Sequence, residues 1–272
     1  MMPNDFFRRH ELLGFFLLVM TLSWGIYAVL SVPGGLGLVA RDNPASGILS
    51  FCKQFSPSIA GLIVAYVAGG RAGARRMRRA ALDWRAAPKW YALVLLAFPL
   101  FLVGAGAVVS VIQGTPALSP DVTPGYLVAT VVFIGIVGPA GEELFGWRGF
   151  ALPGLLERVG DFQASVLLGI VWALWHAPVW SWPLQKGGVP AQLAAVCFVV
   201  AISIVMTWVY RKSGSLLLAG LGVHAASNAA HILPHDSTVW VGHWATTFLA
   251  LVIVATQGLG PWTQTGRSPA AT

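Results

Sequence analysis

Residues 128–150 read VATVVFIGIVGPAGEELFGWRGF, and this stretch decides how the rest of the chain is interpreted. The segment 128–140 is apolar and uncharged, yet two adjacent glutamates, Glu142 and Glu143, follow it at once, and Arg148 comes soon after. Only 10 of the 272 residues are acidic, so this pairing is unusual for the chain. An ionised side chain at the centre of a bilayer costs at least about 2.5–3.5 kcal/mol, so charges in such a segment indicate a functional site.

The composition indicates that the whole chain is embedded in a membrane. It is 56% hydrophobic and 10% charged, with a mean hydropathy of +0.72, whereas soluble proteins are roughly 45–50% apolar and about 25% charged. Since a spanning helix needs about 20 apolar residues, we predict an all-α polytopic membrane protein with about eight transmembrane helices and an active site in a cavity within the helix bundle. The expected helices are 12–32, 52–70, 90–112, 124–150, 163–180, 190–210, 214–231 and 237–257.

The net charge of +7 is best explained by topology rather than by nucleic-acid binding, because the basic residues cluster in short segments between apolar runs. The run RAGARRMRR (71–79) is expected to be part of a basic cytoplasmic loop at 71–89, with a lipid-headgroup or partner site as the alternative. The predicted location is the cell membrane, multi-pass, with both termini cytoplasmic and the lipid bilayer as a partner. The residues placed inside are Arg8, Arg9, those of the loop, Arg158, Arg211, Lys212 and Arg267, and those outside are Arg41 and Lys186.

The chain divides into three predicted regions. Residues 1–120 hold the N-terminal transmembrane helices, with the first interpreted as an uncleaved span, 121–232 form the functional core, and 233–272 hold the last helix and a disordered tail. No internal repeat is visible, which argues against many transporter folds. Cys52 and Cys197 have no paired or metal-ligand spacing and are expected to be packing residues.

Two further polar groups interrupt apolar segments. His176 lies in VWALWHAPVW (171–180), and the nearby Pro178 suggests a helix that ends inside the membrane beside a cavity. His224 and Asn228 lie in GLGVHAASNAA (220–230) at a spacing of four, which places both on one helix face. That pair either makes an interhelical hydrogen bond or reaches one substrate atom.

The spacing of the glutamates and the arginine raises a geometric question. Residues five apart, such as Glu143 and Arg148, point about 140° apart on a straight α-helix. A π-type bulge near Gly146 would absorb one residue and return the two side chains to one face, and such bulges tend to occur at functional sites.

Taken together, these residues resemble the CPBP family of intramembrane proteases, also described as CAAX prenyl protease or Abi proteins. The family's Glu-Glu-x-x-x-Arg, aromatic-x-x-x-His and His-x-x-x-Asn motifs correspond to Glu142-Glu143 with Arg148, Trp172 with His176, and His224 with Asn228. Trp172 stands where the family has Phe, and four residues rather than three separate Glu143 from Arg148. Either a bulge restores the geometry with Glu142 as the first glutamate, or Glu143 takes the first place and Leu144 replaces the second.

The resemblance implies an intramembrane endopeptidase that needs no cofactor and acts on a membrane-embedded or lipid-anchored peptide, CAAX-type prenylated substrates included. In this scheme Glu142 takes a proton from a water that His176 helps to hold. His224 and Asn228 stabilise the oxyanion, and Glu143 pairs with Arg148. Three alternatives stay open: a zinc-dependent metalloprotease that uses the glutamates and histidines, a transporter that relays protons, and a non-proteolytic immunity scaffold.

Overall fold

The structure, a computed structural model, describes residues 10–30, 36–40, 42–116, 122–180, 188–229 and 235–262. Helices make up all the regular structure of these residues except for an isolated bridge between Leu30 and Val39. This confirms the all-α polytopic prediction. Five helical runs of the described chain are long and apolar enough to cross a membrane: Glu11–Val29, Pro44–Ala81, Pro88–Gln113, Pro124–Leu156 and Gln192–Ser213.

The first half of the described chain forms three such runs. The second run bends at Gly70, whose φ of 59° is left-handed, and its basic final turns diverge from the rest. Glycine has no Cβ and so adopts this conformation without strain. The elements are α2 (Glu11–Val29), α3 (Pro44–Cys52), a 3₁₀ turn (Lys53–Phe55), α4 (Ser56–Ala81), α5 (Pro88–Ala92), a π-helical segment (Leu93–Ala97) and α6 (Phe98–Gln113).

The second half contains the candidate functional residues. Its first run is continuous but alternates between α- and π-helical geometry. The elements are α7 (Pro124–Ala129), a π-helical segment (Thr130–Val137), α8 (Gly138–Glu142), a second π-helical segment (Glu143–Ala151), α9 (Leu152–Leu156), α10 (Asp161–Trp180), α11 (Gly188–Ser213), a third π-helical segment (Leu218–Gly222), α12 (Val223–Ser227) and α13 (His235–Gln257).

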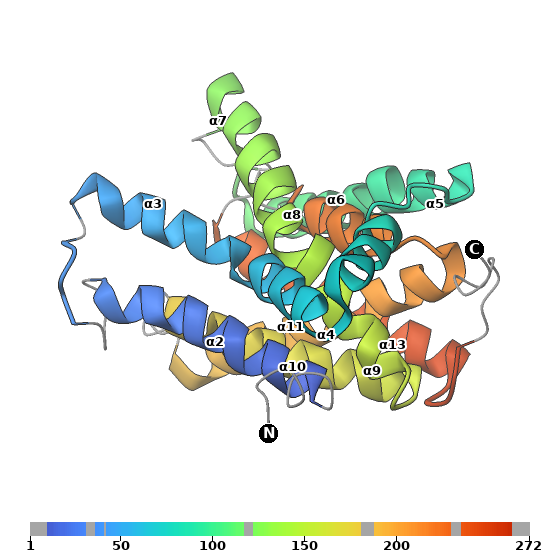
Figure 1. The fold of residues 1–272 in the computed structure, drawn as a ribbon. Helices are drawn as coiled ribbons and strands as arrows, with labels where there is room; N and C mark the ends of the chain where they lie inside the picture. The colour runs from blue at the N-terminus through green and yellow to red at the C-terminus, as the bar shows by residue number, and fades with distance from the viewer. Residues whose placement is uncertain are drawn as a thin grey trace.

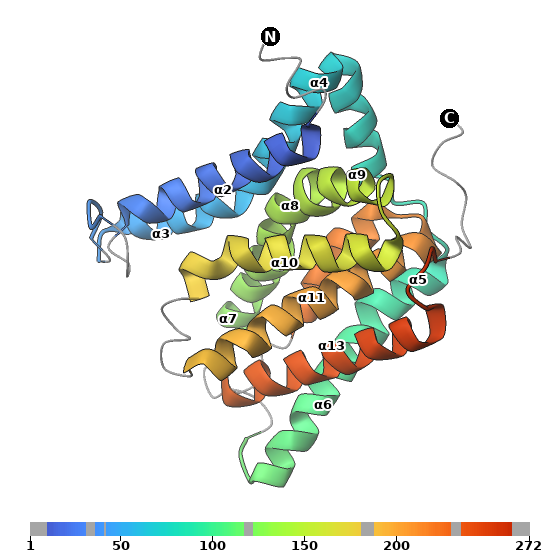
Figure 2. The ribbon, with the colours of Figure 1, turned by 90° about the horizontal axis from the view of Figure 1, so that it is seen from below.

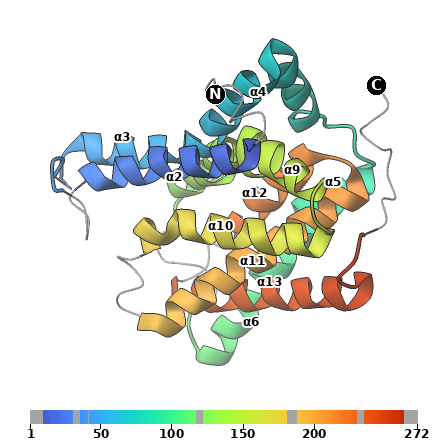
Figure 3. The ribbon, with the colours of Figure 1, turned by 60° about the horizontal axis from the view of Figure 1, so that its bottom comes forward.

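The helices pack into a bundle with α11 near its middle. α10, α11 and α13 form a row, α2 and α3 lie side by side along one edge, and the α7–α9 run crosses between these groups (Figures 1 and 2). α10 begins where α11 and α13 end, as Figure 3 shows. Asp161 fixes this end of the bundle, because its carboxylate accepts hydrogen bonds from Arg211 Nη2 at 2.5 Å and from the backbone N–H of Trp262 at 2.6 Å.

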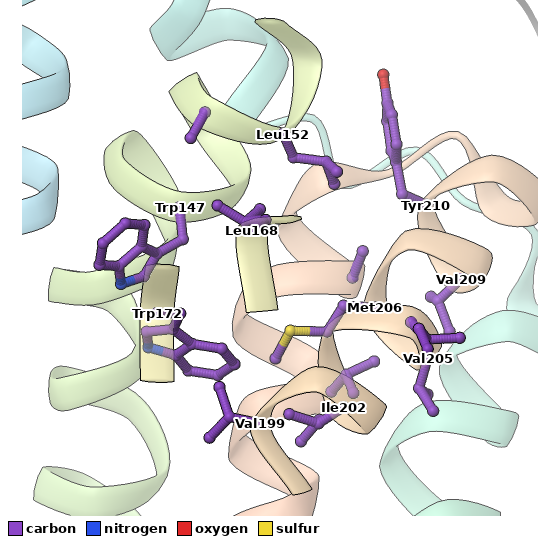
Figure 4. Packing of buried hydrophobic residues seen from close by; sticks show 14 of the residues in the cluster. Trp147, Leu152, Leu168, Trp172, Val199, Ile202, Val205, Met206, Val209 and Tyr210 are labelled. Atoms are coloured by element: carbon purple, nitrogen blue, oxygen red, sulfur yellow. The ribbon is translucent and has the colours of Figure 1, made fainter. Parts of the chain in front are cut away.

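The core is formed where α11 meets the α9 and α10 side of the bundle. Figure 4 shows Ile202 and Met206 of α11 beside Leu168 and Trp172 of α10. Close approach depends on small residues: a Cβ at Gly169 would meet the backbone of Val200. Such contacts are typical of membrane helices, where van der Waals packing replaces the hydrophobic effect as the driving force.

The structure differs from the sequence analysis in the burial of the two cysteines. Cys52 and Cys197 are exposed rather than packed, because the outer face of a membrane helix contacts lipid and apolar neighbours in sequence do not imply burial. α10 continues through Pro178 to Trp180, the end that the sequence predicted for this helix. Arg8, Arg9, Arg41, Lys186, Arg267 and the tail at 263–272 lie outside the described residues.

Candidate active site

The π-helical segment Glu143–Ala151 brings Glu143 and Arg148 together. Arg148 Nη1 donates hydrogen bonds to both carboxylate oxygens of Glu143, at 2.9 and 3.2 Å, and both side chains are fully buried. A π-helix closes its hydrogen bonds at i+5, as the bond from the Leu152 N–H to the Trp147 carbonyl shows. The predicted bulge therefore forms, and it places residues five apart on one face.

A neighbouring helix compensates for the broken α-helical hydrogen bonding. The backbone N–H of Phe145 donates to Ser58 Oγ of α4 at 3.3 Å. α4 and the π-helical segment pack almost backbone to backbone, because a Cβ at Gly61 would collide with the Phe145 carbonyl and one at Gly146 would collide with Pro57. This contact holds the start of α4 against the two glutamates.

Glu143 is the centre of a buried charge cluster. Besides Arg148, it contacts Nδ1 of His224 through Oε1 at 3.0 Å. The Arg148 guanidinium lies 4.4 Å from the centre of the Trp172 ring, and the His224 ring meets the same indole edge to face at 5.4 Å. Glu143, Arg148 and His224 thus form one cluster around Trp172.

Glu142 is buried separately from that pair. Its Oε2 accepts a hydrogen bond from the indole N–H of Trp172 at 3.1 Å, and no cation of the described residues makes an ion pair with it. A single neutral donor to one oxygen leaves the other carboxylate oxygen available to a water or a substrate.

His176 is oriented by its own helix. Its Nδ1 lies 2.9 Å from the backbone carbonyl of Trp172, which can only accept, so Nδ1 carries the proton and Nε2 carries the lone pair. The ring packs edge to face on Trp175 at 4.7 Å. Glu142 and His176 both line a cavity of about 350 Å³, together with Tyr27, Ser50, Phe51, Lys53, Gln54 and Trp175.

Asn228 makes an interhelical hydrogen bond, one of the two roles expected for it. Its Nδ2 donates to the Ile134 carbonyl at 2.7 Å. The N–H of Gly138 is already bonded to Phe133, and Pro139 has no N–H, so the Ile134 carbonyl lacks a donor within its own helix. Neither Asn228 nor His224 lines the cavity that holds Glu142 and His176.

Sequence reasoning missed the contribution of residues 50–56. Lys53 is 3% exposed and lines the cavity, and Ser56 Oγ accepts the indole N–H of Trp175 at 3.3 Å. The signal was present in FCKQFSPS (51–58), where polar residues interrupt the start of an apolar helix. Periodicity alone cannot reveal which distant helix such residues contact.

A metal could be held by Glu142, Glu143 and His224, whose ligand atoms all lie within 4.8 Å of one another. Two carboxylates and an imidazole suit zinc in type and number. However, both oxygens of Glu143 already accept hydrogen bonds from Arg148, and a guanidinium at this distance repels a second cation. The three residue types therefore suit a zinc ion, but the positive charge of Arg148 disfavours its binding.

Comparison with known proteins supports the resemblance found in the motifs. Residues 124–230 match the family model described as type II CAAX prenyl endopeptidase, Rce1-like. A relative in Methanococcus maripaludis, CAAX prenyl protease 2, is 27% identical over 144 residues, which are 50% of this chain and 51% of the relative. The matched region thus spans about half the length of that relative. It contains all seven residues singled out by the motifs, and the match confirms the resemblance to the CPBP family.

Proposed function

We propose, because residues 124–230 match the family model of Rce1-like type II CAAX prenyl endopeptidases, that this protein is an intramembrane endopeptidase that hydrolyses a peptide bond of a lipid-anchored substrate. The observation that carries the proposal is the cavity, in which a buried carboxylate and a half-buried imidazole from different helices line the same space. A peptide with a prenylated CAAX terminus, the substrate class named for the relative, is the first to test.

In the proposed mechanism Glu142 is the general base. One of its oxygens is held by Trp172 at 3.1 Å, so the other can take a proton from water. His176 presents the lone pair of Nε2 to the second proton of that water, since Nδ1 donates to the Trp172 carbonyl. The water then attacks the scissile carbonyl, and Glu142 returns its proton to the leaving amine.

Glu143 and Arg148 are positioning residues in this scheme. Their buried ion pair fixes the π-helical segment, which begins directly after Glu142. Glu143 also holds His224, whose Nδ1 lies 3.0 Å from Glu143 Oε1. In the scheme drawn from the sequence motifs, His224 and Asn228 stabilise the oxyanion. The oxyanion role of these two residues stays a prediction.

The second candidate is a zinc-dependent endopeptidase, favoured by the close approach of Glu142, Glu143 and His224. Zinc would polarise the carbonyl and activate the water. We prefer the metal-independent scheme because Arg148 already neutralises Glu143. No described feature of the bundle specifically supports a transporter or a non-proteolytic immunity scaffold.

The test is cleavage of a synthetic peptide with a prenylated CAAX terminus by the purified protein in detergent or nanodiscs, followed by mass spectrometry. Glu142→Gln is expected to lower the rate about 10²–10⁴-fold, the usual contribution of a general base. Glu157→Gln is the matched control, because Glu157 is exposed just after α9. Equal rates for the wild type and Glu142→Gln would refute the assignment.

A further inference from the structure

Lys53 is a buried cation without a buried anion as its partner. Its side chain is on the 3₁₀ turn between α3 and α4 and is 3% exposed. No carboxylate of the described residues lies within 4.0 Å of its ammonium group. Instead the ammonium group lies 3.6 Å from the centre of the Trp175 ring and 5.1 Å from that of Tyr27.

Aromatic faces attract a cation without neutralising it. A lysine at the edge of a membrane protein usually extends its ammonium group to the interface, but Lys53 is held inside the bundle between two rings. A buried ammonium group that forms no direct ion pair is costly and is kept where it serves a function. The cavity is therefore positively charged at the Lys53 wall.

The cavity that Lys53 lines also contains the two residues proposed to act on the water. Glu142 and His176 line the same space of about 350 Å³ as Lys53, yet Lys53 and Glu142 form no ion pair. Since a water occupies about 30 Å³ in the liquid, this cavity is large enough for a peptide group and a water. A substrate bound there would share the cavity with both the Glu142-activated water and the ammonium group.

We propose that Lys53 binds a negatively charged oxygen of the substrate beside Glu142. This inference rests on the proposed peptidase function and adds a residue that the three motifs do not contain. Two sources supply such an oxygen: the oxyanion that forms when water adds to the scissile carbonyl, and the free C-terminal carboxylate of the peptide. Both accept a charge-assisted hydrogen bond from an ammonium group.

The experiment compares Lys53→Met and Lys53→Arg with the wild type on two prenylated CAAX peptides, one with a free C-terminal carboxylate and one with a C-terminal amide. Lys89→Met is the matched control, since Lys89 is exposed and also lies near an indole, 5.9 Å from the centre of the Trp90 ring. Thermal melting of each variant shows whether the fold is intact.

If Lys53 stabilises the oxyanion, Lys53→Met lowers kcat about 10²–10³-fold on both peptides. If it binds the terminal carboxylate, Lys53→Met raises KM for the free acid about 30-fold or more and leaves the amide unchanged. In either case Lys53→Arg retains more activity than Lys53→Met. Unchanged kinetics for Lys53→Met, or equal losses for Met and Arg, would overturn the proposal.

A wild-type protein that cleaves neither peptide would contradict the peptidase function but would still allow the lysine to be tested. Binding of the two fluorescently labelled peptides is then measured by polarisation in the wild type and in Lys53→Met. If the wild type binds the free acid more tightly than the amide and Lys53→Met binds both equally, an anion site at Lys53 is supported. Equal binding of both peptides by both proteins overturns it.

Discussion

The ion pair between Glu143 and Arg148 allows a quantitative prediction. Both side chains are buried, and Arg148 Nη1 lies 2.9 Å from Glu143 Oε2. Removing one partner of a buried pair typically costs about 3–5 kcal/mol. Arg148 Nε and Nη2 have no hydrogen-bond partner in the described chain, so Glu143→Gln leaves the guanidinium uncompensated and should cost about 5 kcal/mol. Arg148→Met should cost about 3 kcal/mol, because Glu143 keeps its contact with His224.

The double variant Glu143→Gln with Arg148→Met removes both charges and should cost far less than the sum of the single changes. We expect a coupling free energy of about 3 kcal/mol or more. The measurement is the free energy of unfolding in mixed detergent and SDS micelles, with Arg85→Met as a control at an exposed arginine. If the loss of unfolding free energy in the double variant equals the sum of the two single losses within about 0.5 kcal/mol, the buried ion pair is refuted. The π-helical register that creates the pair would be refuted with it.

Three further predictions concern the metal, the end of the bundle and the topology. A strong chelator should leave peptide cleavage unchanged; activity lost on chelation and restored by zinc would favour the metalloprotease. Asp161→Asn should lower the free energy of unfolding by about 3 kcal/mol, because Asp161 is 1% exposed and joins Arg211 to the backbone of Trp262. An unchanged melting curve for this variant would contradict the prediction. A green fluorescent protein fused to the C-terminus should fluoresce while an alkaline phosphatase fusion stays inactive, and the reverse result would place that terminus outside.

The features of the fold that follow from local physics were predictable. Apolar run lengths predicted an all-α membrane protein, although about eight spans were expected and five helical runs of the described chain are long and apolar enough to cross a membrane. The five-residue spacing of Glu143 and Arg148 predicted the π-helical turn near Gly146. Lateral packing was not predictable, because a lipid-facing surface and a protein-facing surface are equally apolar. Cys52 and Cys197 illustrate this, since both are exposed in otherwise apolar segments.

The residues of the candidate site were predictable where they belong to one of the three sequence motifs. Glu142 and His176 meet in one cavity, and His224 reaches Glu143. Lys53 was missed, because its place beside Trp175 depends on how α3 and α4 pack against α10. Asn228 donates a hydrogen bond to the Ile134 carbonyl, which lacks a donor in its own helix because Pro139 has no N–H. The sequence shows this only once the helix around Ile134 is known to be π-helical.

The central claim is that Glu142 activates water for peptide-bond cleavage in the membrane. It is tested most directly by quantitative proteomics of membrane peptides from cells that carry the wild-type protein or Glu142→Ala, at matched protein levels. We predict that at least one membrane-associated protein keeps its full-length form in the variant cells and is shortened in the wild type. Identical peptide profiles in the two strains, with both proteins folded and present, would contradict the claim.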